Sequence, residues 1–134
     1  MQKIADTGLL KAMLDRSDEH HAWAAHQFRN HAPFETCEAV LDELGYITGD
    51  PRLGMKLVAR GDIELSFSLA EHVGEVLSLL EKYADQPMDL ADACIVRMSE
   101  LADNCKVWTV DREDFHIYRR HGRQSIPCEF PKNK

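Results

Sequence analysis

Residues 88–115 place a helical pattern directly before a strand pattern, and this order constrains the fold more than any other stretch of the chain. In the first half, apolar residues recur at three- and four-residue steps, which predicts a helix with one buried stripe. Asp89 precedes the first turn of this helix as a candidate N-cap, and Asp92 lies within that turn. Residues 106–110 are rich in β-branched and aromatic side chains, which favours a strand that stops at Asp111. The segment therefore predicts a helix and then a strand, with a carboxylate early in the helix and another where the strand ends.

The remaining sequence continues this alternation of short strands and helices. Further strands are predicted at 3–6, 34–35, 62–67 and 126–130, and helices at 9–14, 17–28, 36–47, 51–60, 69–84 and 114–121. The pattern over 69–84 predicts the longest amphipathic helix, and Pro127 places the last strand at a sheet edge. Strands that alternate with helices indicate βαβ units, so we expect an α/β fold with a largely parallel sheet covered on both faces. The 134 residues suit a single domain over 1–134.

The charge balance limits the possible functions less than it first suggests. A formal net charge of −7 argues against a nonspecific nucleic-acid binder, but acids gathered around metal ions lower the total without making a substrate surface negative. Arg112 and Arg119 belong to a late basic cluster and are candidate substrate contacts, although solvated helix faces also explain such clusters. No apolar run is long enough for a membrane helix and residues 1–6 do not resemble a signal peptide, so we expect a cytoplasmic protein without a membrane partner.

Several aspartates lie where an open parallel sheet would bind a ligand. Such sheets bind ligands at the carboxyl ends of their strands, and Asp6 and Asp111 follow predicted strands. Each acid also has a purely structural explanation, because Asp6 can cap the next helix and Asp92 is favourably placed against its helix dipole. Asp111 and Asp114 can likewise shape a turn and cap a helix. The position of each acid taken alone does not separate the two explanations.

Glu43 is harder to explain as a surface residue. On a helical wheel of residues 36–47 it lies beside the apolar arc, whereas Glu38 and Asp42 fall on the opposite face. A carboxylate at the margin of a core needs a partner, and this helix contains no Lys or Arg. A metal ion shared with the aspartates at positions 6, 92 and 111 would be such a partner. The alternative is a boundary residue, or one that pairs with a distant arginine.

A cluster of carboxylates implies a particular chemistry. Ligands that offer only oxygen select Mg²⁺ or Mn²⁺ over Zn²⁺. Such a site suits phosphodiester hydrolysis, because the ion orients and deprotonates a water and offsets charge on the phosphate. Thr109 and Thr7 are close in sequence to two of the acids and are candidates to position water or phosphate. An ordinary strand threonine and a helix cap, respectively, explain them equally well.

Four short motifs in this chain resemble those of the PIN-domain family, and within it the VapC-like toxins of bacterial and archaeal toxin–antitoxin pairs. The motifs are Ile4-Ala-Asp-Thr-Gly-Leu9, Ala39-Val-Leu-Asp-Glu-Leu44, Leu90-Ala-Asp-Ala-Cys-Ile95 and Trp108-Thr-Val-Asp-Arg-Glu-Asp-Phe115. Their order and separation span almost the whole chain. Carried over by motif, the acidic cluster of the family falls on Asp6, Glu43, Asp92 and Asp111, with Asp114 and then Asp89 as accessory residues. Glu38, also acidic, lies near the second motif and is the competing choice to Glu43.

This resemblance implies a PIN-like three-layer sandwich, with a parallel sheet of about five strands between helices. It implies Mg²⁺- or Mn²⁺-dependent endoribonuclease activity on RNA, usually as a homodimer. For the VapC-like branch it also implies a cognate antitoxin protein that wraps the toxin and blocks its site.

Other functions remain open from the sequence. A non-catalytic PIN module that binds RNA or a protein partner has the same motifs, and so does a housekeeping PIN nuclease without an antitoxin. The triplet Asp6-Thr7-Gly8 also occurs in aspartic proteases, but those folds are nearly all β and this chain is mostly helix-patterned. A phosphoaspartyl phosphatase would need a second acid at position 8, where this chain has glycine.

Overall fold

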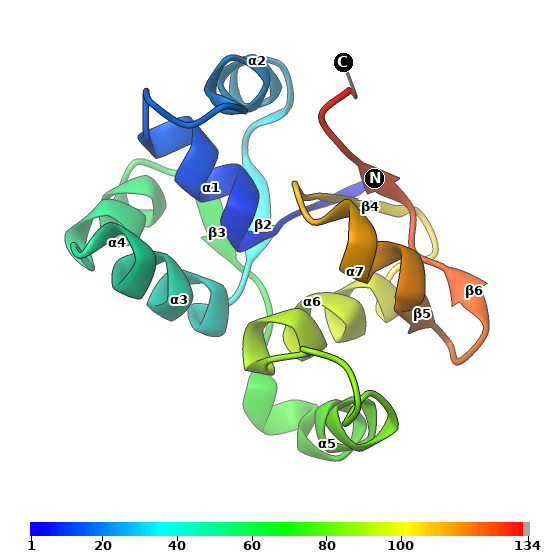
Figure 1. The fold of residues 1–134 in the computed structure, drawn as a ribbon. Helices are drawn as coiled ribbons and strands as arrows, with labels where there is room; N and C mark the ends of the chain where they lie inside the picture. The colour runs from blue at the N-terminus through cyan, green and yellow to red at the C-terminus, as the bar shows by residue number, and fades with distance from the viewer. Residues whose placement is uncertain (133–134) are drawn as a thin grey trace.

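The computed structural model describes residues 1–132 as an α/β fold around one five-stranded parallel sheet (Figure 1). The strands are β1 (Gln2–Ala5), β2 (Phe34–Thr36), β3 (Ile63–Leu65), β4 (Cys105–Trp108) and β7 (Cys128–Glu129). Their order is β3-β2-β1-β4-β7, and each neighbouring pair is parallel. This confirms the predicted fold class and places β1 and β4 side by side at the centre.

Helices flank the sheet on both faces, consistent with a three-layer sandwich. They are α1 (Thr7–Leu14), α2 (His21–His31), α3 (Glu38–Thr48), α4 (Arg52–Ala59), α5 (Val73–Lys82), α6 (Leu90–Glu100) and α7 (Arg112–Ile117). In Figure 1, α1, α3 and α4 lie together on one side and α5 packs along α6 on the other. Within residues 1–132, no helix is both long and apolar enough to cross a bilayer.

The core lies where the central strands meet the helices. Ile4 and Ala5 of β1 and Val107 and Trp108 of β4 are buried, so these strands are covered on both faces as parallel strands usually are. The predicted buried stripe of α6 is confirmed at its centre, where every residue from 93 to 96 is buried, whereas its two ends, Leu90 and Leu101, are exposed. The helix that carries Asp92 is therefore anchored by almost its whole circumference.

The prediction of one long helix over 69–84 is wrong. Residues Leu69–Glu71 form a 3₁₀ turn and α5 follows with ten residues, fewer than the eleven in α2, α3 or α6. His72 separates the two pieces, where its ring stacks on Phe67 and its Nδ1 accepts a hydrogen bond from Arg97. The apolar spacing in the sequence runs across this break, although Leu69 and Val73 on either side of it are exposed, so the pattern alone does not reveal the break.

Two predicted boundaries shift because side chains bond to the backbone. The helix predicted at 17–28 begins only at His21, since the Asp18 carboxylate accepts the His20 N–H and closes a turn first. The strand predicted at 106–110 ends at Trp108, because the Thr109 hydroxyl accepts the Asp111 N–H and turns the chain away from the sheet.

The last part of the chain also differs from its prediction. The helix expected at 114–121 is α7, which begins at Arg112 because Asp111 caps it. A two-stranded hairpin of β5 (Arg119–Arg120) and β6 (Gln124–Ser125) follows and was not predicted. The final strand β7 lies within the predicted 126–130, at an edge of the main sheet.

Candidate functional site

A pocket of about 340 Å³ opens where β1 and β4 end, and it brings together the four acids proposed for the site. Asp6, Glu43, Asp92 and Asp111 all line this pocket, which we call the acidic pocket. They come from the end of β1, the middle of α3, the first turn of α6 and the cap of α7. Residues far apart along the chain therefore converge at the carboxyl edge of the sheet.

Asp6 is the most buried of the four, with 5% of its surface exposed. Its carboxylate caps α1 by accepting the Thr7 N–H at 2.8 Å, and it accepts the Thr109 hydroxyl at 2.8 Å. The pKa of Asp6 is nevertheless raised to about 6. Burial is the main cause, and the charges of Asp111 and Asp89 contribute to the same rise. Within residues 1–132 no Lys, Arg or His forms an ion pair with Asp6. A buried carboxylate held in this way is suited to a cation that arrives from outside.

Asp92 is held in place from two directions. It forms a reciprocal capping box with Asp89 at the start of α6, and its Oδ2 accepts the Tyr118 hydroxyl at 3.2 Å. Burial raises the pKa of Asp92 to about 8, with further contributions from the charges of Asp6 and Asp89. Charge on Asp6 thus disfavours charge on Asp92, as expected for two carboxylates that share a site.

Glu43 projects from α3 towards these aspartates. The pKa of Glu43 is raised to about 7, chiefly by burial. Its hydrogen bond with the Asp89 carboxyl group and the nearby charge of Asp6 contribute to the same rise. Glu38 is exposed and does not line the acidic pocket. Of the two glutamates, the structure therefore places Glu43 beside the aspartates.

Asp111 also lines the acidic pocket, and Asp114 lies beside it on α7. Asp111 accepts the Asp114 N–H at 3.0 Å, and Thr109 joins Asp111 to Asp6 by accepting the Asp111 N–H while donating to Asp6. Burial and the neighbouring Asp111 raise the pKa of Asp114 to about 6. Asp114 does not itself line the acidic pocket, which agrees with its accessory place in the prediction.

The hydroxyl of Thr7 has an unusual environment. Thr7 is 3% exposed and lines the acidic pocket, near enough to the Glu43 carboxylate to lower the pKa of Glu43. Yet among residues 1–132 its hydroxyl has no hydrogen-bond partner of ordinary geometry. A buried polar atom without a partner is costly, so this oxygen is suited to a ligand inside the pocket.

The acids are not arranged as a finished metal cluster. Among residues 1–132, no three His, Cys, Asp or Glu side chains have a geometry ready to hold an ion. Their oxygens instead accept helix-capping N–H groups and the hydroxyls of Thr109 and Tyr118. The donor set itself, with carboxylates and an unpartnered hydroxyl, fits a hard cation such as Mg²⁺ or Mn²⁺.

The sequence did not identify every residue of the acidic pocket. Lys11 and Asp18 line it as well, and the Lys11 ammonium lies 2.6 Å from Asp18 and 3.2 Å from Asp15. Lys11 is four residues after Thr7 on α1, so the helical period could have placed it on the same face. Gly8 was also overlooked: a Cβ there would lie 2.3 Å from Cγ2 of Val110, so glycine allows α1 to approach the 109–111 segment.

Arg112 and Arg119 lie outside the acidic pocket, although the sequence made them candidate substrate contacts. The Arg112 guanidinium donates to the Pro131 carbonyl at 2.7 Å and covers the Phe130 ring at 4.5 Å. Arg119 donates to the His116 and Tyr118 carbonyls. Both side chains thus support the C-terminal part of the fold, and neither reaches the acids directly.

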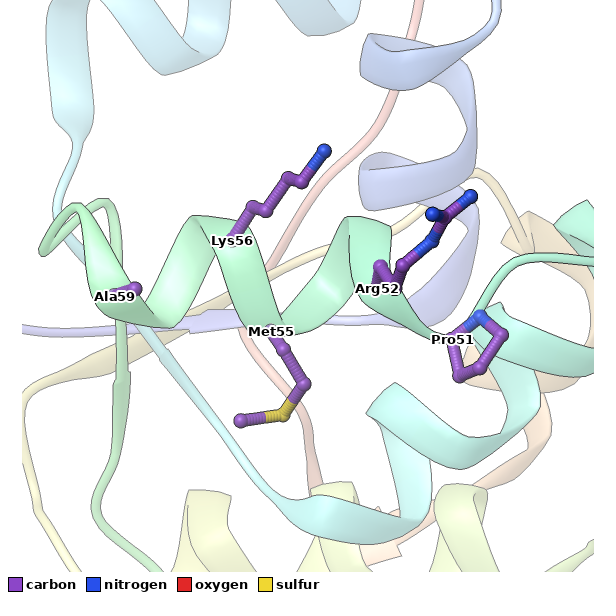
Figure 2. A pocket seen from close by; sticks show the side chains of 5 residues that line it. All are labelled: Pro51, Arg52, Met55, Lys56 and Ala59. Carbon is purple, nitrogen blue, oxygen red and sulfur yellow. The ribbon is translucent and has the colours of Figure 1, made fainter.

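A separate hollow of about 520 Å³ lies on the outer surface of α4 (Figure 2). Figure 2 shows Met55 on one side of the helix and Lys56 on the other, with Pro51, Arg52 and Ala59 completing the lining. It contains no acid and none of the predicted site residues. The four acids proposed for the site therefore lie in the acidic pocket and not in this larger hollow.

Comparison with known proteins finds no family model and no curated protein that matches this chain. The functional argument therefore depends on the residues of the acidic pocket and their geometry.

Proposed function

We propose that this chain is a metal-dependent endoribonuclease of the PIN-domain, VapC-like kind, which hydrolyses RNA phosphodiester bonds. One observation carries the proposal: four carboxylates from four separate elements line a single pocket at the carboxyl edge of a parallel sheet. The raised pKa values of Asp6, Glu43 and Asp92 support it, because burial is the main cause of each rise and neighbouring carboxylates of the same site add to it. We further propose a cytoplasmic toxin that a cognate antitoxin keeps inactive.

In this proposal Asp6, Asp92, Glu43 and Asp111 would hold Mg²⁺ or Mn²⁺. The ion, when bound, supplies an acidified water and offsets charge on the phosphate. Thr109 fixes the orientation of the Asp6 carboxylate, and the Tyr118 hydroxyl with the Asp89 N–H fixes that of Asp92. Partners of this kind keep ligands aimed at the ion.

The substrate meets two further groups at the acidic pocket. The unpartnered Thr7 hydroxyl is available to a water or a phosphate oxygen. Lys11 is the cation that lines the pocket, and it can transfer part of its interaction from Asp18 to an incoming phosphate. These two groups offer contacts for an anionic backbone in an otherwise negative pocket.

A second candidate function is a non-catalytic PIN module that binds RNA or a protein. This function is favoured because, among residues 1–132, no three acidic side chains are already placed to bind one ion. A housekeeping nuclease without an antitoxin would share the whole acidic pocket, so only the genetic neighbourhood distinguishes it from a toxin.

Removal of the ion tests the proposed function. We expect the purified chain to cleave single-stranded RNA internally with Mg²⁺ or Mn²⁺, to lose this activity in EDTA, and to regain it when Mn²⁺ is added in excess. Gel analysis of an RNA labelled at one end measures the cuts. Cleavage that continues in EDTA, or no cleavage with either ion, would contradict a metal-dependent nuclease.

We also propose a homodimer, because α5 presents apolar side chains to solvent. Val73 and Leu77 are 57% and 54% exposed and lie four residues apart on one face of the helix. We expect a dimer in solution. Leu77→Glu should raise the dissociation constant of the dimer at least about tenfold, because an unpaired charge is unfavourable in a buried interface. Light scattering over a dilution series measures this. Glu75→Gln, an exposed position on the other face of α5, is the control, and a wild-type monomer at high concentration would contradict the proposal.

A further inference from the structure

A second pocket of about 530 Å³ lies between α2 and the last described residues, and the proposed chemistry does not use it. Its lining includes Trp23, His26, Gln27, Glu129, Phe130 and Lys132. We call it the aromatic pocket. Its volume lies within the range of small-molecule sites, and its walls combine two aromatic rings with polar groups.

The Gln27 amide gives this pocket a directed hydrogen-bond donor. The indole N–H of Trp108 donates to Oε1 of Gln27 at 2.8 Å. An indole can only donate, so the amide oxygen must face Trp108 and the amide NH₂ group is left for other partners. Among residues 1–132 this NH₂ group has no hydrogen-bond acceptor. The orientation of the amide therefore follows from the chemistry of its buried partner.

The aromatic walls are held firmly enough to stack a ligand. Phe130 lies under the Arg112 guanidinium at 4.5 Å and against the His116 ring at 5.6 Å. Trp23 is half-buried on α2, one turn before Gln27. A nucleobase offers a planar apolar face to such rings and an acceptor at its edge to an amide donor. An amide donor and two aromatic rings in the lining of one pocket thus match an unstacked base.

The acids of the aromatic pocket repel an RNA strand less than their number suggests, because basic groups lie beside them. The Glu129 carboxylate is paired with the Lys106 ammonium at 3.2 Å. Lys132 is exposed at the rim and can meet a phosphate. The lining is therefore close to neutral where a base would enter.

The aromatic pocket adjoins the acidic pocket along two segments of the chain. Asp18 lines the acidic pocket and Glu19, the next residue, lines the aromatic one. Asp111 lines the acidic pocket, and its neighbour Arg112 covers the Phe130 ring of the aromatic one. Neighbouring residues of the chain therefore line both pockets, which is the arrangement that a single strand spanning the two would need.

From this juxtaposition we propose that the aromatic pocket binds one unstacked base of a single-stranded RNA whose backbone crosses the acidic pocket. This inference depends on the proposed nuclease function for the identity of its ligand class. It names Trp23 and Phe130 as stacking residues and Gln27 as the donor to the base edge.

The test measures binding apart from cleavage. The full chain in EDTA is titrated into a fluorescently labelled single-stranded RNA at fixed low salt, and anisotropy reports the affinity. We expect Trp23→Leu to weaken binding at least about tenfold, since stacking on an aromatic side chain contributes this much per base. Gln27→Glu keeps an acceptor for the Trp108 indole but removes the amide donor, so we expect weaker binding without loss of the fold. Asn30→Ala, an exposed position on α2, should bind as the parent does.

A matched abasic oligomer separates a base from a phosphate as the ligand. We expect the abasic strand to bind the parent protein more weakly than the intact strand does. Trp23→Leu should leave the affinity for the abasic strand unchanged. Equal affinity for both strands, or unchanged binding by Trp23→Leu and Gln27→Glu, overturns the inference, as does competition by peptides alone. If Trp23-dependent binding is found but no metal-dependent cleavage, the nuclease proposal fails and the base site stands. If metal-dependent cleavage is found but binding does not depend on Trp23, the base site fails and the nuclease proposal stands.

Discussion

Asp6→Asn and Asp92→Asn are each expected to abolish RNA cleavage while the protein stays folded. Asparagine has nearly the same shape as aspartate and can still accept the capping hydrogen bonds that Asp6 receives from the Thr7 N–H and Asp92 from the Asp89 N–H. It lacks the negative charge that holds a divalent ion. We expect cleavage more than about 100-fold slower, because even outer-shell partners of a metal contribute about 10- to 100-fold. Initial rates on a labelled RNA measure the loss, and circular dichroism reports the fold.

Helix α3 offers a matched pair of variants for the same test. Glu43 lines the acidic pocket, whereas its neighbour Asp42 is exposed. We expect Glu43→Gln to lose activity as the aspartate variants do, and Asp42→Asn to cut RNA at the parent rate. If Asp6→Asn or Asp92→Asn also cut at the parent rate, the assignment of the acidic pocket as the nuclease site would be wrong.

The metal-free protein is expected to lose stability as the pH rises from about 4 to about 8. The pKa values of Asp6, Glu43 and Asp92 are raised to about 6, 7 and 8, chiefly by burial. The folded state therefore binds more protons than the unfolded state over this range, so the free energy of unfolding falls with increasing pH. The stabilisation is complete below the ordinary carboxyl pKa and is lost through pH 6 to 8. Thermal melting in EDTA at several pH values measures this slope.

A divalent ion should reverse the trend, because it binds the charged acids that are costly in the empty site. At an ion concentration 100 times Kd we expect about 2.7 kcal/mol of added stability near pH 8. For a chain of this length that is a rise in Tm of roughly 10 °C. The rise should be small near pH 5, where the acids are protonated. Asp92→Asn should flatten both effects, and Glu38→Gln, an exposed position on α3, should change neither. A Tm that Mn²⁺ leaves unchanged at pH 8 would favour the non-catalytic module.

Local patterns predicted the elements well wherever one physical factor dominated. The alternation of strands with helices depends on burial and is confirmed, and so is the central part of the apolar stripe of α6. The predictions failed where a side chain competed with the backbone. Asp18 and Thr109 moved the boundaries of α2 and β4 in this way, and the stacked His72 divided the predicted 69–84 helix. The β5–β6 hairpin was missed although Gly122 adopts a positive φ in its turn.

The sequence by itself determined which acids were candidates, because strand ends and a helical wheel are properties of neighbouring residues. It placed Asp6 and Asp111 after strands and Glu43 at the margin of a core. Only the tertiary structure decided that these acids meet in one pocket, that the Thr7 hydroxyl has no hydrogen-bond partner among residues 1–132, and that Lys11 and Tyr118 contact the acidic residues there. The reason is physical: pairing of β1 with β4 and packing of α3 and α6 bring together residues up to 105 positions apart, and the burial that raises their pKa values exists only after that packing.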